Sequence, residues 1–445
     1  MYLMVRKAML KLRGSKRYEY LREYEQLQWQ NLDKIENYQF YKLKKLLNHA
    51  YKSVPYYKNL FKNLGIHPDD IHNKDDYSKI PILTKNIIKA NQHELISDRF
   101  DLKTLIRNTT GGSTGEPLQF YREKDVYEQM SANLMLGLKM AGWNEKKSLI
   151  LIWGNPKDIQ KKNDIILRLK SIFSMSVTLN AYKYDQRSFD SWIQTILNSG
   201  NNVYIYGYPS VISDFAYYIS SKKINIENVK AIQTSAEQLL PEQKEIIENV
   251  FKCKAFDQYG SRECPGISCE CEKGSMHIFC HSNLVEFIDD PSTPEGTKKL
   301  IVTPLSSYAM PFIRYEIGDF AVPLEDQCSC GRGFPLMQMK IGRIYDKFIC
   351  ANGQVVHGTL LVRQVAGIKG IKNFQFHQKD FTNINLFIVK TSSFDDADEE
   401  KINSIGKNIS AFLGSDVNLD INYVESIPQT IGGKHRQFIS DMRFS

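Results

Sequence analysis

At 445 residues, the chain is long enough for two or three domains of about 150 residues each, and its 42% hydrophobic residues can bury a sizeable core. The net charge of +8, from 58 basic and 50 acidic residues, is a mild excess that indicates no nucleic-acid partner, because no basic stripe interleaved with aromatic residues accompanies it. No apolar run reaches the length of about 18 residues that a membrane-spanning helix needs, so we expect no transmembrane segment.

The first 22 residues mix apolar with basic side chains. They do not form a signal-peptide pattern, because Arg6, Lys7 and Lys11 interrupt the apolar residues, and we therefore expect a cytoplasmic protein. Such a segment is typical of a helix with a solvated basic face, which we favour, or of weak peripheral contact with an anionic membrane. The pattern of residues 23–100 is mostly helical, so residues 1–100 are expected to form a helical N-terminal part of the large domain.

A glycine-rich stretch follows, which reads Thr109, Thr110, Gly111, Gly112, Ser113, Thr114 and Gly115. Glycines at this density let backbone N–H groups approach an anion, and the hydroxyls add donors, so the stretch is typical of a phosphate-binding loop. An ordinary polar turn is the alternative, because the same residue types dominate loops. The loop is not of the Walker type, since Glu116 follows Gly115 where that motif has lysine.

From this stretch onward, strand and helix patterns alternate, which predicts an α/β sheet. The expected strands are 118–121, 148–153, 203–206, 229–233 and 255–258, and the expected helices are 125–141, 164–173, one that starts after residue 210, and 241–251. Ligands of such sheets bind beyond the carboxyl ends of the strands, where the loops at Gly207, Ser235 and Tyr259 fall.

Four further motifs follow in order, and each alone is a weak signal. They are Tyr259-Gly260-Ser261-Arg262-Glu263, Arg314-Tyr315-Glu316-Ile317-Gly318-Asp319, Gly342-Arg343-Ile344-Tyr345-Asp346 and Pro428-Gln429-Thr430-Ile431-Gly432-Gly433-Lys434. With the glycine-rich stretch, this series resembles the adenylate-forming superfamily, in its phenylacetate-CoA ligase-like branch, which includes capsular polysaccharide biosynthesis relatives. The resemblance covers roughly residues 80–445.

The resemblance implies a role for each motif. Residues Thr109 to Gly115 would hold the ATP phosphates, and Ser235, Ala236 and Glu237 would pack along the adenine. The segment Gln258, Tyr259, Gly260 and Ser261 would contact the base, and Asp319 with Arg343 would bind the ribose. Glu263 would hold Mg²⁺, Asp346 would be the hinge, and Lys434 would reach the α-phosphate and the attacking carboxylate. The implied catalytic residues are Lys434, Glu263 and Thr110. Taken singly, Asp319, Glu263 and Lys434 could equally be a strand end, a helix cap and an exposed loop lysine.

The implied activity is ATP-dependent activation of a small carboxylic acid as an acyl-adenylate, with release of pyrophosphate and subsequent acyl transfer. The favoured acceptor is the CoA thiol. The alternatives are acyl or adenylyl transfer to an amine or sugar hydroxyl in surface polysaccharide biosynthesis, and a zinc-stabilised binding protein without turnover. Three departures from the family pattern bear on the choice: Glu116 replaces a lysine, Arg262 replaces a threonine, and Glu316-Ile317 replace an Arg-Thr pair.

The cysteines cluster, and without a secretory signal such clustering favours a metal site over disulfides. The spacing of Cys271 and His277, followed by Cys328 and Cys330, supplies the four soft or imidazole ligands of a structural zinc site. The same four residues are similar to the zinc site of the phenylacetate-CoA ligase-like branch. Buried free thiols with a satisfied histidine are the alternative, and the remaining candidate ligands are Cys264, Cys269 and Cys280.

The pattern after residue 343 indicates a small α+β unit, with strands around 374–377, 384–390 and 417–424 and a helix at 398–413. We therefore expect an α/β large domain, with the zinc-binding β-rich subdomain and catalytic core in residues 101–343, and a mobile lid in residues 344–445. The acid pocket is expected near Trp153, Tyr206, Tyr208 and the strand that ends near Gln233, where the aromatic residues could equally be core. The oligomeric state is left open, with a homodimer as one option.

Overall fold

The computed structural model describes residues 2–109, 118–153, 176–181, 184, 186–290, 293, 295–343, 347–349, 355–357, 364–365, 368, 370–413, 417–428 and 436–442. Its N-terminal part is helical, as predicted. The helices are α1 Tyr2–Leu12, α2 Arg17–Leu27, α3 Leu32–Ser53, α4 Pro55–Leu64, α5 Lys74–Ser78 and α6 Lys85–Ala90, with 3-10 turns at Pro68–Asp70 and Leu102–Thr104.

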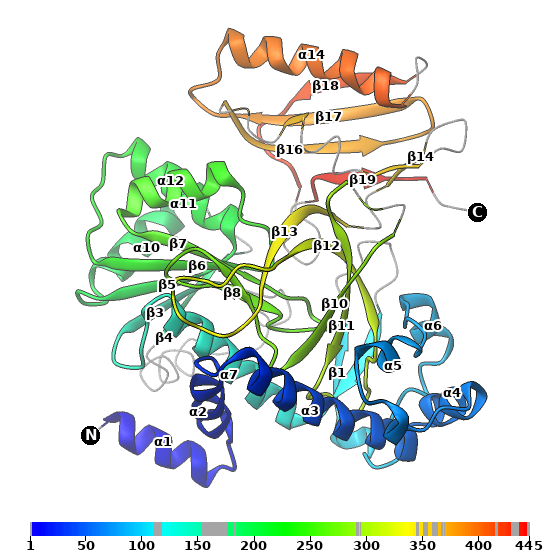
Figure 1. Ribbon diagram of the computed structural model, residues 1–445. Coiled ribbons are helices and arrows are strands. Elements are labelled where there is room, and N and C mark those ends of the chain that lie inside the picture. Colours follow the sequence, from blue (N-terminus) through cyan, green and yellow to red (C-terminus); the bar gives the residue numbers. More distant parts are fainter. Residues whose placement is uncertain are drawn as a thin grey trace.

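Helix α3 runs along the lower edge of the molecule, beside the antiparallel strands (Figure 1). The side chain of Asn31 begins it by accepting a hydrogen bond from the Lys34 N–H, which satisfies one of the unpaired donors of the first turn. Its buried residues Ile35, Leu43 and Leu47 recur at helical spacing and form one apolar face. The N-terminal helices are thus packed onto the sheet by hydrophobic burial.

One sheet of eleven strands forms the centre of the large domain, in the order β10-β11-β12-β13-β9-β8-β7-β6-β5-β3-β4. Its parallel part consists of β3 Ser148–Trp153, β4 Ser176–Asn180, β5 Val203–Gly207, β6 Val229–Ser235 and β7 Lys254–Tyr259. Its antiparallel part consists of β8 Ser268–Glu270, β9 Met276–Ile278, β10 Asn283–Ile288, β11 Lys298–Pro304, β12 Tyr315–Leu324 and β13 Leu336–Arg343. A separate hairpin pairs β1 Ile106–Thr109 with β2 Gln119–Arg122.

Helices cover both faces of the parallel strands. The helices α10 Gln186–Leu197, α11 Pro209–Ser221 and α12 Pro241–Phe251 lie on one face, and α7 Lys124–Met140 on the other (Figure 1). Alternate residues of a strand point to opposite faces, so that Ile150 and Ile205 join the cluster under α10 to α12, whereas Leu149 and Tyr204 join the cluster that contains residues of α7. The predicted α/β fold class is confirmed.

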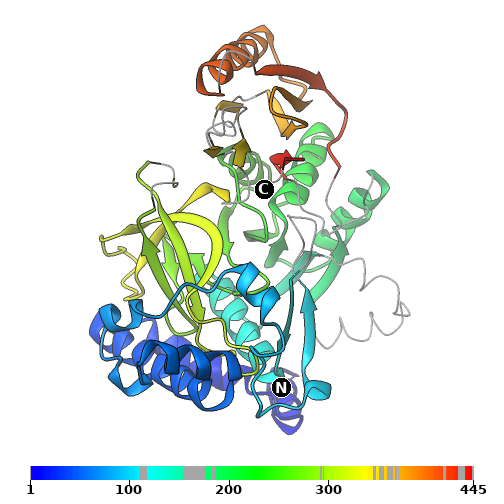
Figure 2. The same cartoon turned by 90° about the vertical axis from the view of Figure 1, so that its right-hand side faces the viewer.

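The C-terminal unit is a four-stranded sheet in the order β18-β17-β16-β19, backed by one long helix (Figures 1 and 2). Its elements are β16 Ile371–Gln378, β17 Asn383–Lys390, α14 Asp396–Leu413, β18 Asn418–Tyr423 and β19 Phe438–Ser440, preceded by the hairpin β14 Lys347–Ile349 and β15 Val355–His357. It buries a hydrophobic core of its own. The α+β class of this unit is confirmed, and the boundaries at residues 100 and 343 stay predictions.

Two expectations concern membranes. Within the described ranges, no helix combines the length and the apolar character that crossing a bilayer requires. In α1 the ammonium of Lys7 lies 3.7 Å from a carboxylate oxygen of Glu145, so that this residue of the basic helix contacts the body of the protein. Peripheral membrane contact by the N-terminal segment stays a prediction.

Candidate active site

The hairpin of β1 and β2 carries the glycine-rich stretch. Thr109 ends β1 and pairs with Gln119 of β2, while Thr110, Gly111, Gly112, Ser113, Thr114 and Gly115 lie outside the described residues. The carbonyl of Thr109 accepts a hydrogen bond of 2.9 Å from Nη1 of Arg262. The base of the predicted phosphate loop is therefore tied to the segment that contains Glu263.

The predicted adenine segments lie side by side, because they follow neighbouring parallel strands. Ser235 of β6 pairs with Gln258 of β7, and Tyr259 and Gly260 continue from there. Ala236 has a φ of +72°, a left-handed conformation that costs a non-glycine residue of the order of 1–3 kcal/mol and marks a sharp exit from the strand. A carboxylate oxygen of Glu237 accepts a hydrogen bond of 3.2 Å from the N–H of Ser210 in the first turn of α11.

One of the two predicted ribose ligands contacts the predicted adenine segment. The hydroxyl of Tyr259 donates a hydrogen bond of 2.8 Å to Oδ2 of Asp319, which is 6% exposed. Asp319 of β12 is the strand partner of Arg343 in β13, whose side chain is not among those described. Residues 259, 319 and 343 come from three separate motifs of the sequence, and the fold brings them together through this hydrogen bond and the pairing of β12 with β13.

A second cluster surrounds Glu263, which is 9% exposed. Its Oε1 accepts a hydrogen bond of 3.1 Å from the hydroxyl of Tyr315 and lies 3.9 Å from the ammonium of Lys85. The buried guanidinium of Arg122 donates to the backbone carbonyls of Arg262 and Glu263, which fixes this loop. The sequence offered no signal for Lys85 or Arg122, because each approaches Glu263 from a distant part of the chain, and it gave Tyr315 a place in a motif but no role.

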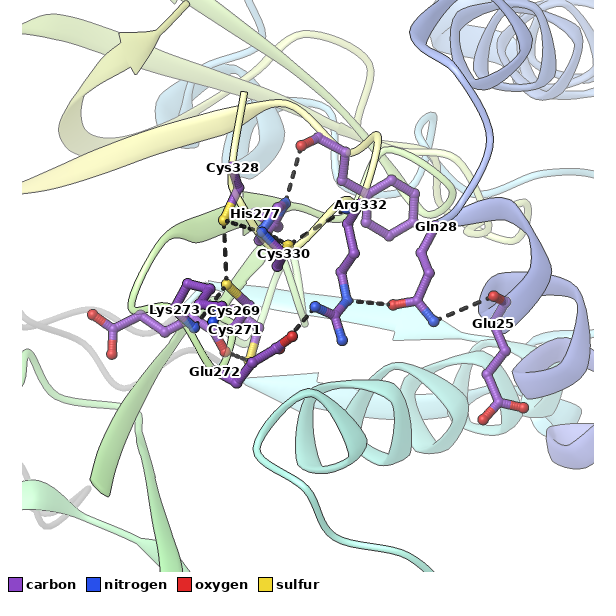
Figure 3. Close-up of polar contacts among 12 residues, drawn as sticks. Glu25, Gln28, Cys269, Cys271, Glu272, Lys273, His277, Cys328, Cys330 and Arg332 are labelled. Carbon is purple, nitrogen blue, oxygen red and sulfur yellow. Dashed lines mark hydrogen bonds and ion pairs between the residues drawn. The ribbon is translucent and has the colours of Figure 1, made fainter. Parts of the chain in front are cut away.

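The four predicted zinc ligands converge. The ligand atoms of Cys271, His277, Cys328 and Cys330 all lie within 4.8 Å of one another. The sulfurs of Cys271 and Cys328 are 3.6 Å apart, and Sγ of Cys330 lies 3.3 Å from Nε2 of His277 (Figure 3). Three thiols and an imidazole at this spacing are the donor set of a structural zinc site.

Surrounding groups orient these four side chains. Nδ1 of His277 donates to the carbonyl of Phe334 at 3.0 Å, which leaves the lone pair of Nε2 facing the cluster. The backbone N–H groups of Lys273 and Arg332 point at the sulfurs of Cys271 and Cys330, at 3.4 and 3.5 Å, as donors to thiolates do. The guanidinium of Arg332 also donates to Gln28, and thereby ties the cluster to the N-terminal helices (Figure 3).

The other candidate cysteines do not join the cluster. Sγ of Cys269 faces the amide of Gln233, whose Nε2 donates to it at 3.1 Å. The thiol of Cys280 is directed to the carbonyl of Ile278, and that of Cys264 is buried next to the Glu263 loop. The geometry thus selects Cys271, rather than its neighbour two residues earlier, as the partner of His277.

Comparisons with known proteins show what the chain is similar to. Residues 348–441 match the model of the CapK C-terminal domain. The chain is 25% identical to Protein CapK of Staphylococcus aureus over 419 residues. This alignment covers 93% of this chain and 90% of that protein. It is 23% identical over 416 residues to the phenylacetate-coenzyme A ligase of Pseudomonas putida, covering 86% and 89%. The chain is thus similar over most of its length both to CapK and to a phenylacetate-CoA ligase.

Solved structures show the same fold. One is a 2-hydroxyisobutyryl-CoA ligase in complex with 2-HIB-AMP, in the postadenylation state. Its superposition covers 94% of this chain and 92% of the ligase chain, with a TM-score of 0.73 and 18% sequence identity. The same ligase with 2-HIB-AMP and CoA in the thioesterification state gives a TM-score of 0.62 at 17% identity over the same shares. The predicted resemblance to adenylate-forming ligases is confirmed.

The aromatic residues predicted to line the acid pocket lie at the ends of β3 and β5. The ring of Trp153 stacks on that of Tyr208 at a centroid distance of 4.4 Å and on that of Tyr206 at 5.3 Å. The amide of Gln233, by contrast, is directed to Gln258 and Cys269. The three rings form one aromatic cluster at the expected edge of the sheet, and their contact with an acid stays a prediction.

The lid touches the large domain through an ion pair. Lys372 of β16 lies 3.2 Å from a carboxylate oxygen of Asp214 in α11, and the other oxygen of Asp214 accepts a hydrogen bond from Tyr184 at 2.9 Å. The predicted hinge Asp346 and the predicted catalytic Lys434 lie outside the described residues.

Behind the adenine segment, burial and the nearby charge of Glu270 raise the pKa of Asp257 to about 7. Its Oδ1 accepts hydrogen bonds from the hydroxyl of Thr234 and the N–H of Gln258, both at 3.0 Å. The native state therefore binds more protons at this site than the unfolded chain, whose aspartates have a pKa of about 3.9. Stability consequently falls as the pH rises from about 4 to about 7.

The variant Asp257→Asn keeps the acceptor oxygen and lacks this titration. We expect it to be more stable than the wild type by a margin that grows from pH 5 to pH 8. Urea unfolding at the two pH values measures that margin. An equal difference between variant and wild type at both pH values would show that Asp257 does not titrate in this range.

Proposed function

We propose that the chain is an AMP-forming ligase, which activates a carboxylic acid with ATP and then transfers the acyl group, with the CoA thiol as the favoured acceptor. The observation that carries the proposal is the contact of 2.8 Å between the Tyr259 hydroxyl and the buried carboxylate of Asp319, at the end of parallel strand β7. A base-stacking ring and a diol acceptor at such a strand end are suited to a nucleoside. The sequence similarity to a phenylacetate-coenzyme A ligase, which extends over 89% of that protein, supports the same activity.

Each proposed role follows from the charge that the reaction handles. A carboxylate that attacks an α-phosphorus brings two anions together, so catalysis depends on positioning and on positive charge held near the phosphates. We assign Asp319 to the two ribose hydroxyls, because a carboxylate can accept two charge-assisted hydrogen bonds, and Arg343 to the same sugar. Thr109 to Gly115 would bind phosphates, Ser235 to Glu237 and Gln258 to Ser261 the adenine, and Lys434 the α-phosphate and the acid.

Glu263 fits a magnesium ligand. It is a buried carboxylate with one oxygen held by Tyr315, and hard oxygen donors are what Mg²⁺ prefers. When bound with ATP, Mg²⁺ would neutralise phosphate charge. The protein's own contribution is to hold the carboxylate in place through Tyr315 and through the carbonyl contact of Arg122.

The Cys271, His277, Cys328 and Cys330 cluster fits a structural Zn²⁺ ion. Its four donors are soft or imidazole groups, all three of its thiols face backbone N–H groups, and the histidine tautomer is set by a carbonyl. Because all four ligands come from the protein, no position is left for a substrate, and we assign the ion a role in stability.

The similarity of the C-terminal unit to CapK supports a second class of acyl acceptor. Residues 348–441 match the CapK C-terminal domain model, and CapK is a relative over 93% of the chain. The lid would present the acceptor-side face in the second step. An amine or a sugar hydroxyl is therefore the alternative acceptor.

The test is carboxylate-dependent exchange of pyrophosphate into ATP across aryl, short-chain, fatty and hydroxy acids. Exchange with at least one acid supports adenylation, and release of AMP upon addition of CoA, an amine or a sugar then identifies the acceptor class. If ATP binds but no acid supports exchange, the result would favour a zinc-stabilised binding protein without turnover.

A further inference from the structure

The N-terminal segment combines positive charge with exposed apolar side chains. Residues 1–18 contain six basic residues and no acidic residue. Leu12, the last residue of α1, is 87% exposed, and Met9 of the same helix is 40% exposed. We propose that the outer face of α1 docks on a lipid bilayer that contains anionic lipids. This inference does not depend on the proposed ligase activity.

Contacts within α1 and beyond its end decide which side of the helix faces outward. The ammonium of Lys7 lies 3.7 Å from a carboxylate oxygen of Glu145 and 4.6 Å from the ring centroid of Tyr18. At the start of α2, Nη2 of Arg17 donates a hydrogen bond of 2.9 Å to Oε1 of Glu128 in α7. The side of α1 that carries Lys7 is therefore fixed against the large domain.

Helical spacing places an apolar stripe between two basic residues on the outer side. Successive residues of an α-helix are about 100° apart. The N–H of Arg13 still donates to the carbonyl of Met9 at 3.1 Å, so that this spacing extends to Arg13. Ala8, Met9 and Leu12 consequently share one face, with Lys11 on one flank and Arg13 on the other. All five residues are exposed, which agrees with an outer face that the protein itself does not cover.

An anionic bilayer matches both properties of this face. Its headgroups attract the basic flanks, and the boundary between headgroups and acyl chains takes up an apolar side chain such as that of Leu12. The long basic side chains can cover apolar surface with their methylene stems while their charges stay among the headgroups. A purely polar polyanion would leave Leu12 in water, so the exposed leucine favours a lipid surface over a nucleic acid.

The location of α1 suits such docking. In both views the helix lies at the periphery of the large domain, at the end of the molecule opposite the C-terminal unit (Figures 1 and 2). Contact through this face would therefore hold the protein at a membrane surface without covering the C-terminal unit.

Co-sedimentation of the full chain with vesicles tests the proposal. We expect binding to vesicles of phosphatidylcholine mixed with phosphatidylglycerol, and none to pure phosphatidylcholine. Binding should be lost at about 1 M salt, where the Debye length falls to about 3 Å. A basic residue near an anionic surface contributes about fivefold to the partition coefficient, so Lys11→Gln/Arg13→Gln should weaken binding about 25-fold. Leu12→Ser should weaken it about tenfold, because the leucine no longer enters the bilayer boundary.

Two lysines of α4 supply the matched control for charge. Lys58 and Lys62 are exposed and lie one turn apart, and Lys58→Gln/Lys62→Gln changes the net charge by the same amount as the α1 double variant. Leu197→Ser is the control for the leucine, since Leu197 ends α10 and is 45% exposed. Both controls should leave vesicle binding unchanged.

Three results would overturn the proposal. Equal losses in the two double variants would show that net charge governs binding, and not the face of α1. A wild type that binds neither kind of vesicle, or both equally, would exclude recognition of anionic lipid. A wild-type dimer that Leu12→Ser converts to a monomer, without vesicle binding, would assign the face to a second copy of the chain. Because the substituted residues are exposed, urea unfolding should give the same stability for every variant.

Discussion

Replacement of Lys434 by alanine is expected to reduce carboxylate-dependent ATP–pyrophosphate exchange by about 100- to 1,000-fold, the usual effect of removing one group that stabilises charge in the transition state. The reason is that no other lysine in the C-terminal motif can neutralise the two anions that meet at the α-phosphorus. The affinity for ATP should change far less than the exchange rate, because the nucleoside contacts are assigned to the large domain.

Lys379→Ala is the matched control for this prediction. Lys379 is an exposed lysine of the same lid, in the turn between β16 and β17, and its removal should leave exchange unchanged. An unchanged exchange rate in Lys434→Ala would show that Lys434 is not needed for adenylation and that another group supplies the positive charge.

Loss of one thiol from the metal cluster is expected to be the largest perturbation of stability. Cys271→Ala should lower the free energy of unfolding of the large domain by about 3 kcal/mol or more, because loss of a structural metal belongs to the most destabilising classes of change. The cluster joins β8 and β9 to the loop at Cys328, and Arg332 carries the connection on to Gln28. Metal analysis of the purified protein and urea unfolding are the two measurements.

Cys280→Ala is the control, since Cys280 is a buried thiol on the segment after β9 that does not face the cluster. It should retain a full complement of zinc. A wild-type protein that contains no zinc after expression in zinc-supplemented medium would contradict the assignment, as would an undiminished zinc content in Cys271→Ala.

The sequence was sufficient to predict those features that depend on local pattern. The strands 148–153 and 203–206 are short apolar runs, and their alternation with helices predicted the α/β sheet in which they pair in parallel. The zinc ligands were predictable because two short-spaced clusters are themselves a chemical signature. Cys271 was predicted as the ligand, whereas Cys269 stayed a candidate until the structure directed its thiol to Gln233.

Features that depend on distant pairings had no local signal. The bridge of Leu83 to Tyr315 brings Lys85 to Glu263, and no periodicity near residue 85 indicates it. A β-rich subdomain was expected, but its strand pairings were not, because pairs such as Leu336 with His277 join residues far apart in the chain. Such contacts are selected by burial of the whole sheet and not by the propensity of either segment.

The most direct test of the proposed chemistry uses a carboxylic acid labelled with ¹⁸O in both oxygens, chosen from the acids that support exchange. Attack of the carboxylate on the α-phosphorus, followed by acyl transfer to CoA, leaves one carboxylate oxygen on the phosphate. Mass spectrometry of the nucleotide product should therefore find AMP that carries one ¹⁸O atom. Unlabelled AMP, or ADP as the product, would contradict an acyl-adenylate intermediate and with it the central claim.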